Sequence, residues 1–437
     1  MYCSVERVFA PQLVGKPLVV LSSNDGACVA RSEEAKALGV QMAQPWFQVR
    51  HLERSAGLIA VSANFELYAD MSSRMMAIEA RFAPRQQIYS IDESFLDFEG
   101  VRGDLVAIGR DLRAAVWQEV GLPTCVGIGP TKTLAKLANH IAKSAERKPG
   151  SYPAHLAQVC HVGTMGREEL ERHFAATEVG EVWGIGRKIG AKLREGGIQT
   201  VLDLVRADVM TLRRQFSVVL EKTVLELRGT PCMSIDDAPA PRQQILVSRS
   251  FGKAVTTLDG IIEAVSEFAS RAAEKLRSQQ SVASAIHVFF STSPFRQNER
   301  QHQASVTMPL VRPTADTRVL VAAAAATVRQ QYRVGFNYAK AGVMLVDLQQ
   351  ADEASQGELD LFGSAEIDAV APAAGRDRAR LMDAMDVLNR RFGRDAVRIG
   401  SATVASSQQE TRAWAIKQER RSPRWTTRWD EIPVVRA

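Results

Sequence analysis

A proline-rich break near residues 229–244 constrains the fold most, because it separates two parts of the chain with different patterns. The break holds three prolines among small and polar residues, which indicates a linker. Before it, short strands alternate with helices, and residues 166–230 then have a purely helical pattern. The 437 residues are enough for two to four domains. We therefore predict a chain of the α+β class with several domains.

The part after the break predicts a second α+β domain. Four apolar strand patterns alternate with two amphipathic helices in the order β-α-β-β-α-β, the split βαβ or ferredoxin-like arrangement. The predicted strands are Ile245–Phe251, Ser284–Ser291, Ala304–Leu310 and Ala341–Leu348. Residues 350–376 are rich in small and acidic residues and indicate a flexible tether. A further helix and a basic, tryptophan-containing tail follow it.

Composition and charge exclude several classes of protein. The longest apolar run, Val319–Val328, is far shorter than the ~20 residues that span a bilayer, and no signal peptide opens the chain. We therefore expect a cytoplasmic protein that makes no membrane contact. The net charge of +6 permits nucleic-acid binding without demonstrating it. The five cysteines are widely spaced, so reduced thiols are expected rather than disulfides or a zinc site.

An acidic turn is the first candidate for chemistry. Two β-prone runs, Gln87–Ile91 and Ser94–Phe98, flank Asp92 and Glu93, so both carboxylates can converge on one cation. Mg²⁺ prefers such oxygen ligands, and two ions can clamp the attacking and leaving oxygens of a phosphoryl transfer. The alternative is an ordinary acidic hairpin turn, which is common.

A basic helix follows the next strand. Lys132, Lys136 and Lys143 come after a Gly-x-Gly turn at residues 127–129, so a polyphosphate there would meet both amides and ammonium groups. The spacing does not match the P-loop motif. The alternative is a solvated lysine face.

Two further motifs indicate binding. The segment Gly184-Ile185-Gly186-Arg187-Lys188 predicts a helix-hairpin-helix, whose glycines let backbone amides approach a DNA phosphate, and the alternative is a plain helical turn. Within the tether, residues 356–362 hold an isolated Leu-x-Leu-Phe pattern that predicts docking into a partner's pocket, although such patterns also arise by chance.

Taken together, these motifs resemble those of the Y-family translesion DNA polymerases, and among them the UmuC-type catalytic subunits. The similarity extends over essentially the whole chain. It is carried by the segments at 23–26, 35–39, 64–72, 90–95, 127–136, 182–186 and 422–428.

The resemblance implies a right-hand architecture. It places the palm at 1–9 and 76–165, the fingers at 10–75, the thumb at 166–230, a linker at 231–243, the little finger at 244–349, the tether at 350–376 and a C-terminal UmuC-type region at 377–437.

The resemblance also implies roles for individual residues. Asp92 would be a metal ligand and Glu93 the second active-site carboxylate, with two Mg²⁺ ions as cofactors. Lys36 and Lys143 match positions that touch the incoming triphosphate, and Tyr2 matches the aromatic residue that excludes a ribose 2′-hydroxyl. Other roles follow the motifs: DNA contact for residues 184–188 and for Arg249, Lys253 and Arg277, and sliding-clamp binding for Gln356, Leu359, Leu361 and Phe362.

The implied activity is error-prone, template-directed addition of dNTPs to primer–template DNA during SOS-type damage tolerance. The implied partners are a sliding clamp, a UmuD′-like accessory subunit and a RecA-like filament.

One departure from the family pattern concerns the metal site. Family members begin with a strand that carries a third carboxylate just before the gate aromatic, whereas this chain begins at Met1, past that point. We therefore expect Met1 to be an internal methionine of a longer reading frame. The alternative functions are a catalytically impaired protein that binds DNA and the sliding clamp, and a nucleotide cyclase, whose core also carries carboxylates on a hairpin.

Overall fold

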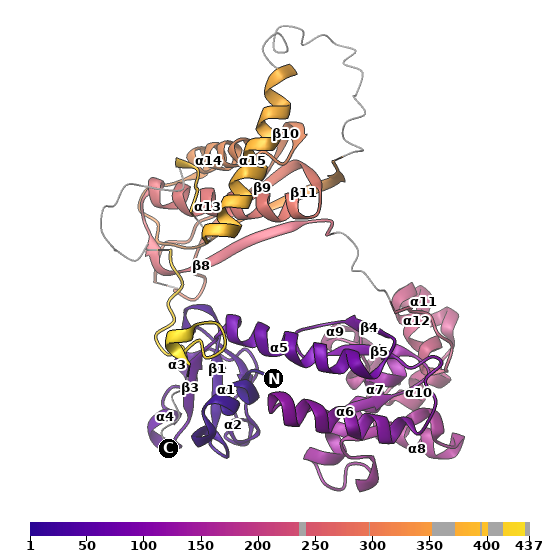
Figure 1. Cartoon of the computed structure of the whole chain (residues 1–437). Helices are drawn as coiled ribbons and strands as arrows, with labels where there is room; N and C mark the ends of the chain where they lie inside the picture. The colour runs from indigo at the N-terminus through magenta and orange to yellow at the C-terminus, as the bar shows by residue number, and fades with distance from the viewer. Residues whose placement is uncertain (236–241, 297, 352–371, 394–395, 401–413, 433–437) are drawn as a thin grey trace.

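The computed structural model describes residues 1–235, 242–296, 298–351, 372–393, 396–400 and 414–432. Two units follow one another along the chain (Figure 1): an N-terminal unit, residues 1–235, and a second unit, residues 242–351. Among the described residues, no helix is long and apolar enough to cross a membrane.

The N-terminal unit begins with a small sheet in the order β2-β1-β3, the N-terminal sheet. Strand β1 (Leu18–Leu21) is fully buried and pairs antiparallel with β2 (Cys28–Arg31) and parallel with β3 (Ile59–Ser62). The surrounding helices are α1 (Tyr2–Phe9), η1 (Pro11–Leu13), η2 (Ser23–Asp25), α2 (Glu33–Ala37), α3 (Trp46–Val49), α4 (Leu52–Ser55), α5 (Phe65–Glu79) and η3 (Ala80–Phe82).

Two two-stranded sheets come next. The predicted acidic hairpin is confirmed as β4 (Arg85–Ile88) and β5 (Ser94–Asp97), and β6 (Val126–Ile128) pairs parallel with β7 (Val159–His161). Helix α6 (Leu105–Val120) precedes β6, and the predicted basic helix after the glycine turn is α7 (Lys132–Arg147). Gly127 lets α7 pack directly on β6, since a Cβ there would lie 2.1 Å from the Asn139 amide nitrogen.

The helical segment after β7 shares a core with α7. Its helices are α8 (Arg167–Ala176), α9 (Arg187–Glu195), α10 (Val201–Arg206), α11 (Val209–Gln215) and α12 (Val218–Leu227), with 3₁₀ turns η4 (Ala154–Leu156), η5 (Val162–Thr164) and η6 (Val179–Glu181) around them. Leu134, Leu137 and Ile141 of α7 pack in one buried cluster with Leu193 and Leu204. The helical segment is therefore joined to α7 by apolar packing.

A buried carboxylate adds a polar joint between α12 and α7. Glu226 is 0% exposed, and its Oε2 accepts hydrogen bonds from Thr133 N (2.9 Å) and Thr133 Oγ1 (2.7 Å). Its Oε1 accepts from the amides of Cys232 (3.1 Å) and Met233 (3.0 Å). One side chain thus caps the first turn of α7 and anchors the chain that leaves α12.

The second unit has the predicted β-α-β-β-α-β order. Its elements are β8 (Ile245–Val255), α13 (Leu258–Ser278), β9 (Ser281–Thr292), β10 (Gln303–Thr314), α14 (Thr317–Gln331) and β11 (Tyr338–Gln350). The sheet order is β10-β9-β11-β8 with antiparallel neighbours, so β11 lies between the parallel pair β8 and β9, as a split βαβ unit requires. Both helices pack on the sheet around a core that includes Phe268, Phe290 and Tyr338.

Candidate functional site

The acidic turn between β4 and β5 is tied by local hydrogen bonds. The amides of Tyr89 and Ser90 both donate to the carbonyl of Glu93 at 3.0 Å, which closes the turn. The Ser90 hydroxyl donates to Asp92 Oδ1 at 2.9 Å. Because the turn is fixed in this way, the Asp92 carboxylate is held at an exposed position beside Glu93.

Helix α7 brings two lysines to the second carboxylate. Lys136 Nζ lies 2.7 Å from Glu93 Oε2, and Lys143 Nζ lies 3.9 Å from Glu93 Oε1. Three aromatic rings surround Lys136, with centroids 4.4 Å (Tyr89), 5.3 Å (Phe95) and 5.7 Å (Trp183) from its Nζ. Lys136 therefore positions Glu93 and is largely screened from solvent, with 14% of its side chain exposed.

A cavity of about 950 Å³ opens between β5 and β6, and both carboxylates line it. Lys143, Arg147 and the glycine turn at 127–129 contribute to its wall. Its volume lies within the range of sites that take small molecules and cofactors. The structure therefore brings the predicted acidic turn and the predicted basic helix to one cavity.

Tyr2 lies close to the acidic turn. Its ring stacks on Tyr68 of α5, with centroids 4.4 Å apart and planes at 18°. Burial, followed by the nearby Asp92 carboxylate, raises the pKa of the Tyr2 hydroxyl. The N-terminal helix thus presents a packed aromatic residue within electrostatic reach of Asp92.

The other predicted triphosphate contact, Lys36, is linked to α7 through Glu33. Lys36 Nζ donates to Glu33 Oε1 at 2.7 Å, and Arg147 Nη1 lies 3.4 Å from the same oxygen. The hydrogen bond from Lys36 is the largest cause of the lowered pKa of Glu33. Sequence reasoning missed Arg147, although it follows Lys143 by one helical turn and so shares its face.

The Gly-Ile-Gly turn of the predicted helix-hairpin-helix lies between the 3₁₀ turn η6 and helix α9, and α10 follows α9. Val182 and Ile185 are buried, and Gly184 has a φ of 88°, a conformation that favours glycine. Gly186, Arg187 and Lys188 are exposed at the start of α9. The amides and charges that DNA contact requires therefore lie at the surface.

The remaining predicted contacts have different surroundings. Arg249 lies on β8 opposite Ala341 and is half-buried. Arg277 forms two 2.7 Å contacts with the Asp386 carboxylate of α15 (Pro372–Phe392), so its guanidinium packs against that helix. The predicted clamp-binding peptide, residues 356–362, lies outside the described residues.

The donor set for a metal is the acidic pair. In the parts of the chain that the structure describes, no three His, Cys, Asp or Glu side chains converge as a metal site. Asp92 and Glu93 offer only carboxylate oxygens, which suit a hard divalent ion that also takes phosphate ligands. The exposed Asp92 carboxylate on the cavity fits such an ion.

Comparison with known proteins places the whole sequence. The impB/mucB/samB family matches residues 1–140, its C-terminal domain matches 242–361, and a domain of unknown function matches 379–435. The protein UmuC of Salmonella typhimurium is 42% identical over 439 residues, covering 100% of this chain and 98% of that protein. The protein MucB of Escherichia coli is 40% identical over 437 residues, covering 100% and 97%.

More distant proteins agree with this result. A DNA polymerase IV of Corynebacterium diphtheriae is 28% identical over 72% of this chain and 67% of its own length. A solved Y-family DNA polymerase chimera has the same fold, with a TM-score of 0.61, 21% identity and coverage of 80% of this chain and 96% of its own. The fold predicted from the motifs is therefore confirmed, and this chain belongs to the impB/mucB/samB family.

Proposed function

We propose that this chain is an error-prone translesion DNA polymerase subunit that adds dNTPs to a primer end opposite a damaged template. The observation that carries the proposal is the acidic turn on the cavity, in a chain related over its whole length to UmuC and MucB. The shared fold with a Y-family polymerase supports it. None of these relatives supports the alternatives, an impaired binding protein or a nucleotide cyclase.

In this proposal, Asp92 and Glu93 would hold two Mg²⁺ ions, which supply activation of the primer hydroxyl and charge neutralisation on the triphosphate. Lys136 keeps Glu93 oriented toward the cavity through its 2.7 Å contact. Lys36, Lys143 and Arg147 supply positive charge for the phosphates. Tyr2, stacked on Tyr68, excludes a ribose 2′-hydroxyl.

The unit boundaries follow the same proposal. The N-terminal sheet with α2–α4 corresponds to the fingers, the hairpin with α6 and α7 to the palm, α8–α12 to the thumb and the second unit to the little finger. Arg187 and Lys188 would contact the DNA backbone without reading sequence. A sliding clamp, a UmuD′-like subunit and a RecA-like filament remain the proposed partners.

Primer extension with Mg²⁺ tests the proposal. We expect Asp92→Ala and Glu93→Ala to abolish incorporation while the affinity for primer–template DNA stays within about twofold. Asp70→Ala is the matched control, because that carboxylate forms a surface pair with Arg74 outside the site. Incorporation by Asp92→Ala at the parent rate contradicts the proposal. DNA binding without incorporation by the parent chain favours the impaired binding protein.

A further inference from the structure

The C-terminal segment 414–432, here called the strap, runs from the second unit to the N-terminal unit. Figure 1 shows it in yellow, leaving the second unit and ending beside α3 and β3. At its start, Trp414 is 4% exposed and packs edge-on against Phe268 of α13, with centroids 5.9 Å apart. The strap is therefore rooted in the core of the second unit before it reaches the other.

A three-way junction marks the point where the strap leaves the second unit. Gly252 of β8 donates its amide to the carbonyl of Ala415 at 3.2 Å, and a Cβ at Gly252 would lie 2.6 Å from that oxygen. The Asn24 side chain of the N-terminal unit donates to Ser250 O at 2.8 Å and accepts from Lys417 N at 2.7 Å. One asparagine thus contacts both the second unit and the strap.

The strap then extends the open edge of the N-terminal sheet. The Ser62 amide of β3 donates to Arg420 O at 3.0 Å, and the Arg420 amide donates to Ser62 Oγ at 3.0 Å. Gln418 Nε2 donates to Ala63 O at 2.7 Å. Strand β3 lies at the edge of its sheet, and the strap pairs with it at an isolated parallel bridge between Ser62 and Arg421, which satisfies a backbone group that an edge leaves unpaired.

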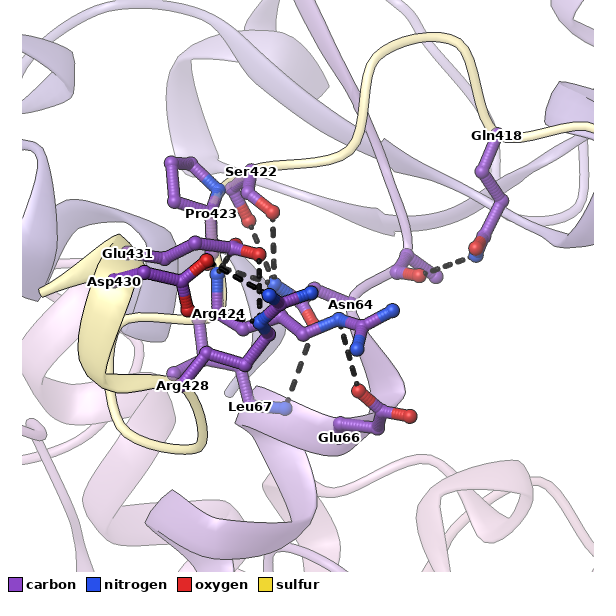
Figure 2. A network of polar contacts seen from close by, with 11 residues as sticks. Asn64, Glu66, Leu67, Gln418, Ser422, Pro423, Arg424, Arg428, Asp430 and Glu431 are labelled. Atoms are coloured by element: carbon purple, nitrogen blue, oxygen red, sulfur yellow. Dashed lines mark hydrogen bonds and ion pairs between the residues drawn. The ribbon is translucent and has the colours of Figure 1, made fainter. Parts of the chain in front are cut away.

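Asn64 forms the centre of the attachment (Figure 2). Its side chain is 1% exposed and donates to Ser422 O (3.1 Å), Ser422 Oγ (3.1 Å) and Pro423 O (3.0 Å). The same side chain accepts from the Leu67 amide and so caps α5. The start of α5 is therefore built partly from the strap.

Beyond its contacts with Asn64, the strap also contacts helix α1. Ser422 Oγ donates to Glu6 Oε1 at 3.0 Å, and the Tyr68 hydroxyl donates to the same oxygen at 2.6 Å. Trp425 stacks on Phe9, with centroids 5.0 Å apart and planes at 15°. Buried polar groups and an aromatic stack give this end of the strap the character of a packed interface rather than of a surface tail.

We propose that the strap fastens the second unit to the N-terminal unit, and that its release lets the two units separate. The strap packs into the core of the second unit at Trp414 and onto the N-terminal unit at Ser422 and Trp425, and Asn24 adds a hydrogen bond from the N-terminal unit to Ser250 of the second unit. The strap lies within the matched domain of unknown function, so the proposal gives this part of the domain a structural role. It does not depend on the polymerase assignment.

The test changes only strap side chains in the full-length chain. We expect the triple variant Gln418→Ala, Ser422→Ala, Trp425→Ala to raise the amide exchange rate at Ser62 at least tenfold and to increase the radius of gyration in small-angle X-ray scattering. The control is the double variant Thr427→Ala, Trp429→Ala, which removes exposed strap side chains, Trp429 being 91% exposed. It should leave both quantities at their parent values.

A second variant disturbs the contact between the strap and β8 by a change in β8. Gly252→Ala places a methyl group against Ala415 O without changing the strap, and we expect the same increases in exchange and radius. Faster exchange with an unchanged radius in both variants would overturn the proposal, because the strap would then be released without the units separating. Unchanged exchange in the triple variant would overturn it as well.

Discussion

Replacing Glu226 with glutamine should weaken the attachment of α12 to α7 and lower the free energy of unfolding of the N-terminal unit by an amount that follows from the hydrogen bonds of Glu226. The carboxylate accepts four hydrogen bonds, two at each oxygen. An amide nitrogen would face two of these donors with its own N–H groups, so one pair of bonds is lost. Hydrogen bonds to charged groups contribute about 1.5–3 kcal/mol each, so we expect a loss of about 3 kcal/mol or more.

Differential scanning calorimetry of the full-length chain measures this effect. For a cooperative unit of roughly 150–250 residues, about 3 kcal/mol corresponds to a fall of about 6–12 °C in the Tm of the N-terminal unit. The transition of the second unit should not move, because the four hydrogen bonds that Glu226 accepts come from Thr133, Cys232 and Met233 of the N-terminal unit.

The control is Glu221→Gln on the same helix. Glu221 forms an ion pair with Arg213 at 3.1 Å, in which 53% of the arginine side chain and 14% of the glutamate side chain are exposed. A single ion pair with a half-exposed arginine contributes about 0–1 kcal/mol, so the Tm of this variant should stay within about 4 °C of the parent. Equal Tm values for the Glu226 and Glu221 variants would refute the reasoning from the four contacts.

Three further predictions concern the site and the strap. Tyr2→Ala should raise the ratio of ribonucleotide to deoxyribonucleotide kcat/KM by about tenfold or more, measured by single-nucleotide incorporation, and an unchanged ratio would remove Tyr2 from the gate. Arg187→Ala with Lys188→Ala should weaken DNA binding and lower the slope of log affinity against log salt by about 1–2, measured by fluorescence anisotropy, and a parent-like slope would contradict phosphate contact. Burial raises the pKa of Glu6 above its ordinary 4.5, so its contribution to stability is present below pH 4.5 and is lost as the pH rises through the raised pKa. The Tm of Glu6→Gln should therefore rise relative to the Tm of the parent as the pH rises from 4.5 through the raised pKa of Glu6. A Tm difference that stays constant with pH would argue against a buried, titrating carboxyl.

Local patterns predicted the elements that carry the site. The lysines after the Gly-x-Gly turn located α7, the flanking β-prone runs located the acidic turn, and the glycine pattern located the turn before α9. Each of these signals lies within about twenty residues of sequence, where helical and strand periodicity can be read directly.

Contacts between distant residues could not be predicted in the same way. Glu226 looks like an ordinary helical glutamate between two leucines, and its burial depends on Thr133, 93 residues earlier. The pair Lys136 and Glu93 is 43 residues apart, and the attachment of Ser422 to Asn64 spans 358 residues. These contacts exist only after packing brings the elements together, so periodicity carries no signal for them.

The position of Arg420 has a consequence for synthesis on the ribosome. Its backbone partner at Ser62 precedes it by 358 residues, and chains grow at about 5–20 residues per second. The outer edge of strand β3 therefore stays unpaired for about 20–70 s, until the strap has been synthesised. During that interval, the unpaired backbone groups of β3 in the nascent chain can bind chaperones or strands of other nascent chains. In a chain stalled before residue 420, this edge of the sheet would remain unpaired.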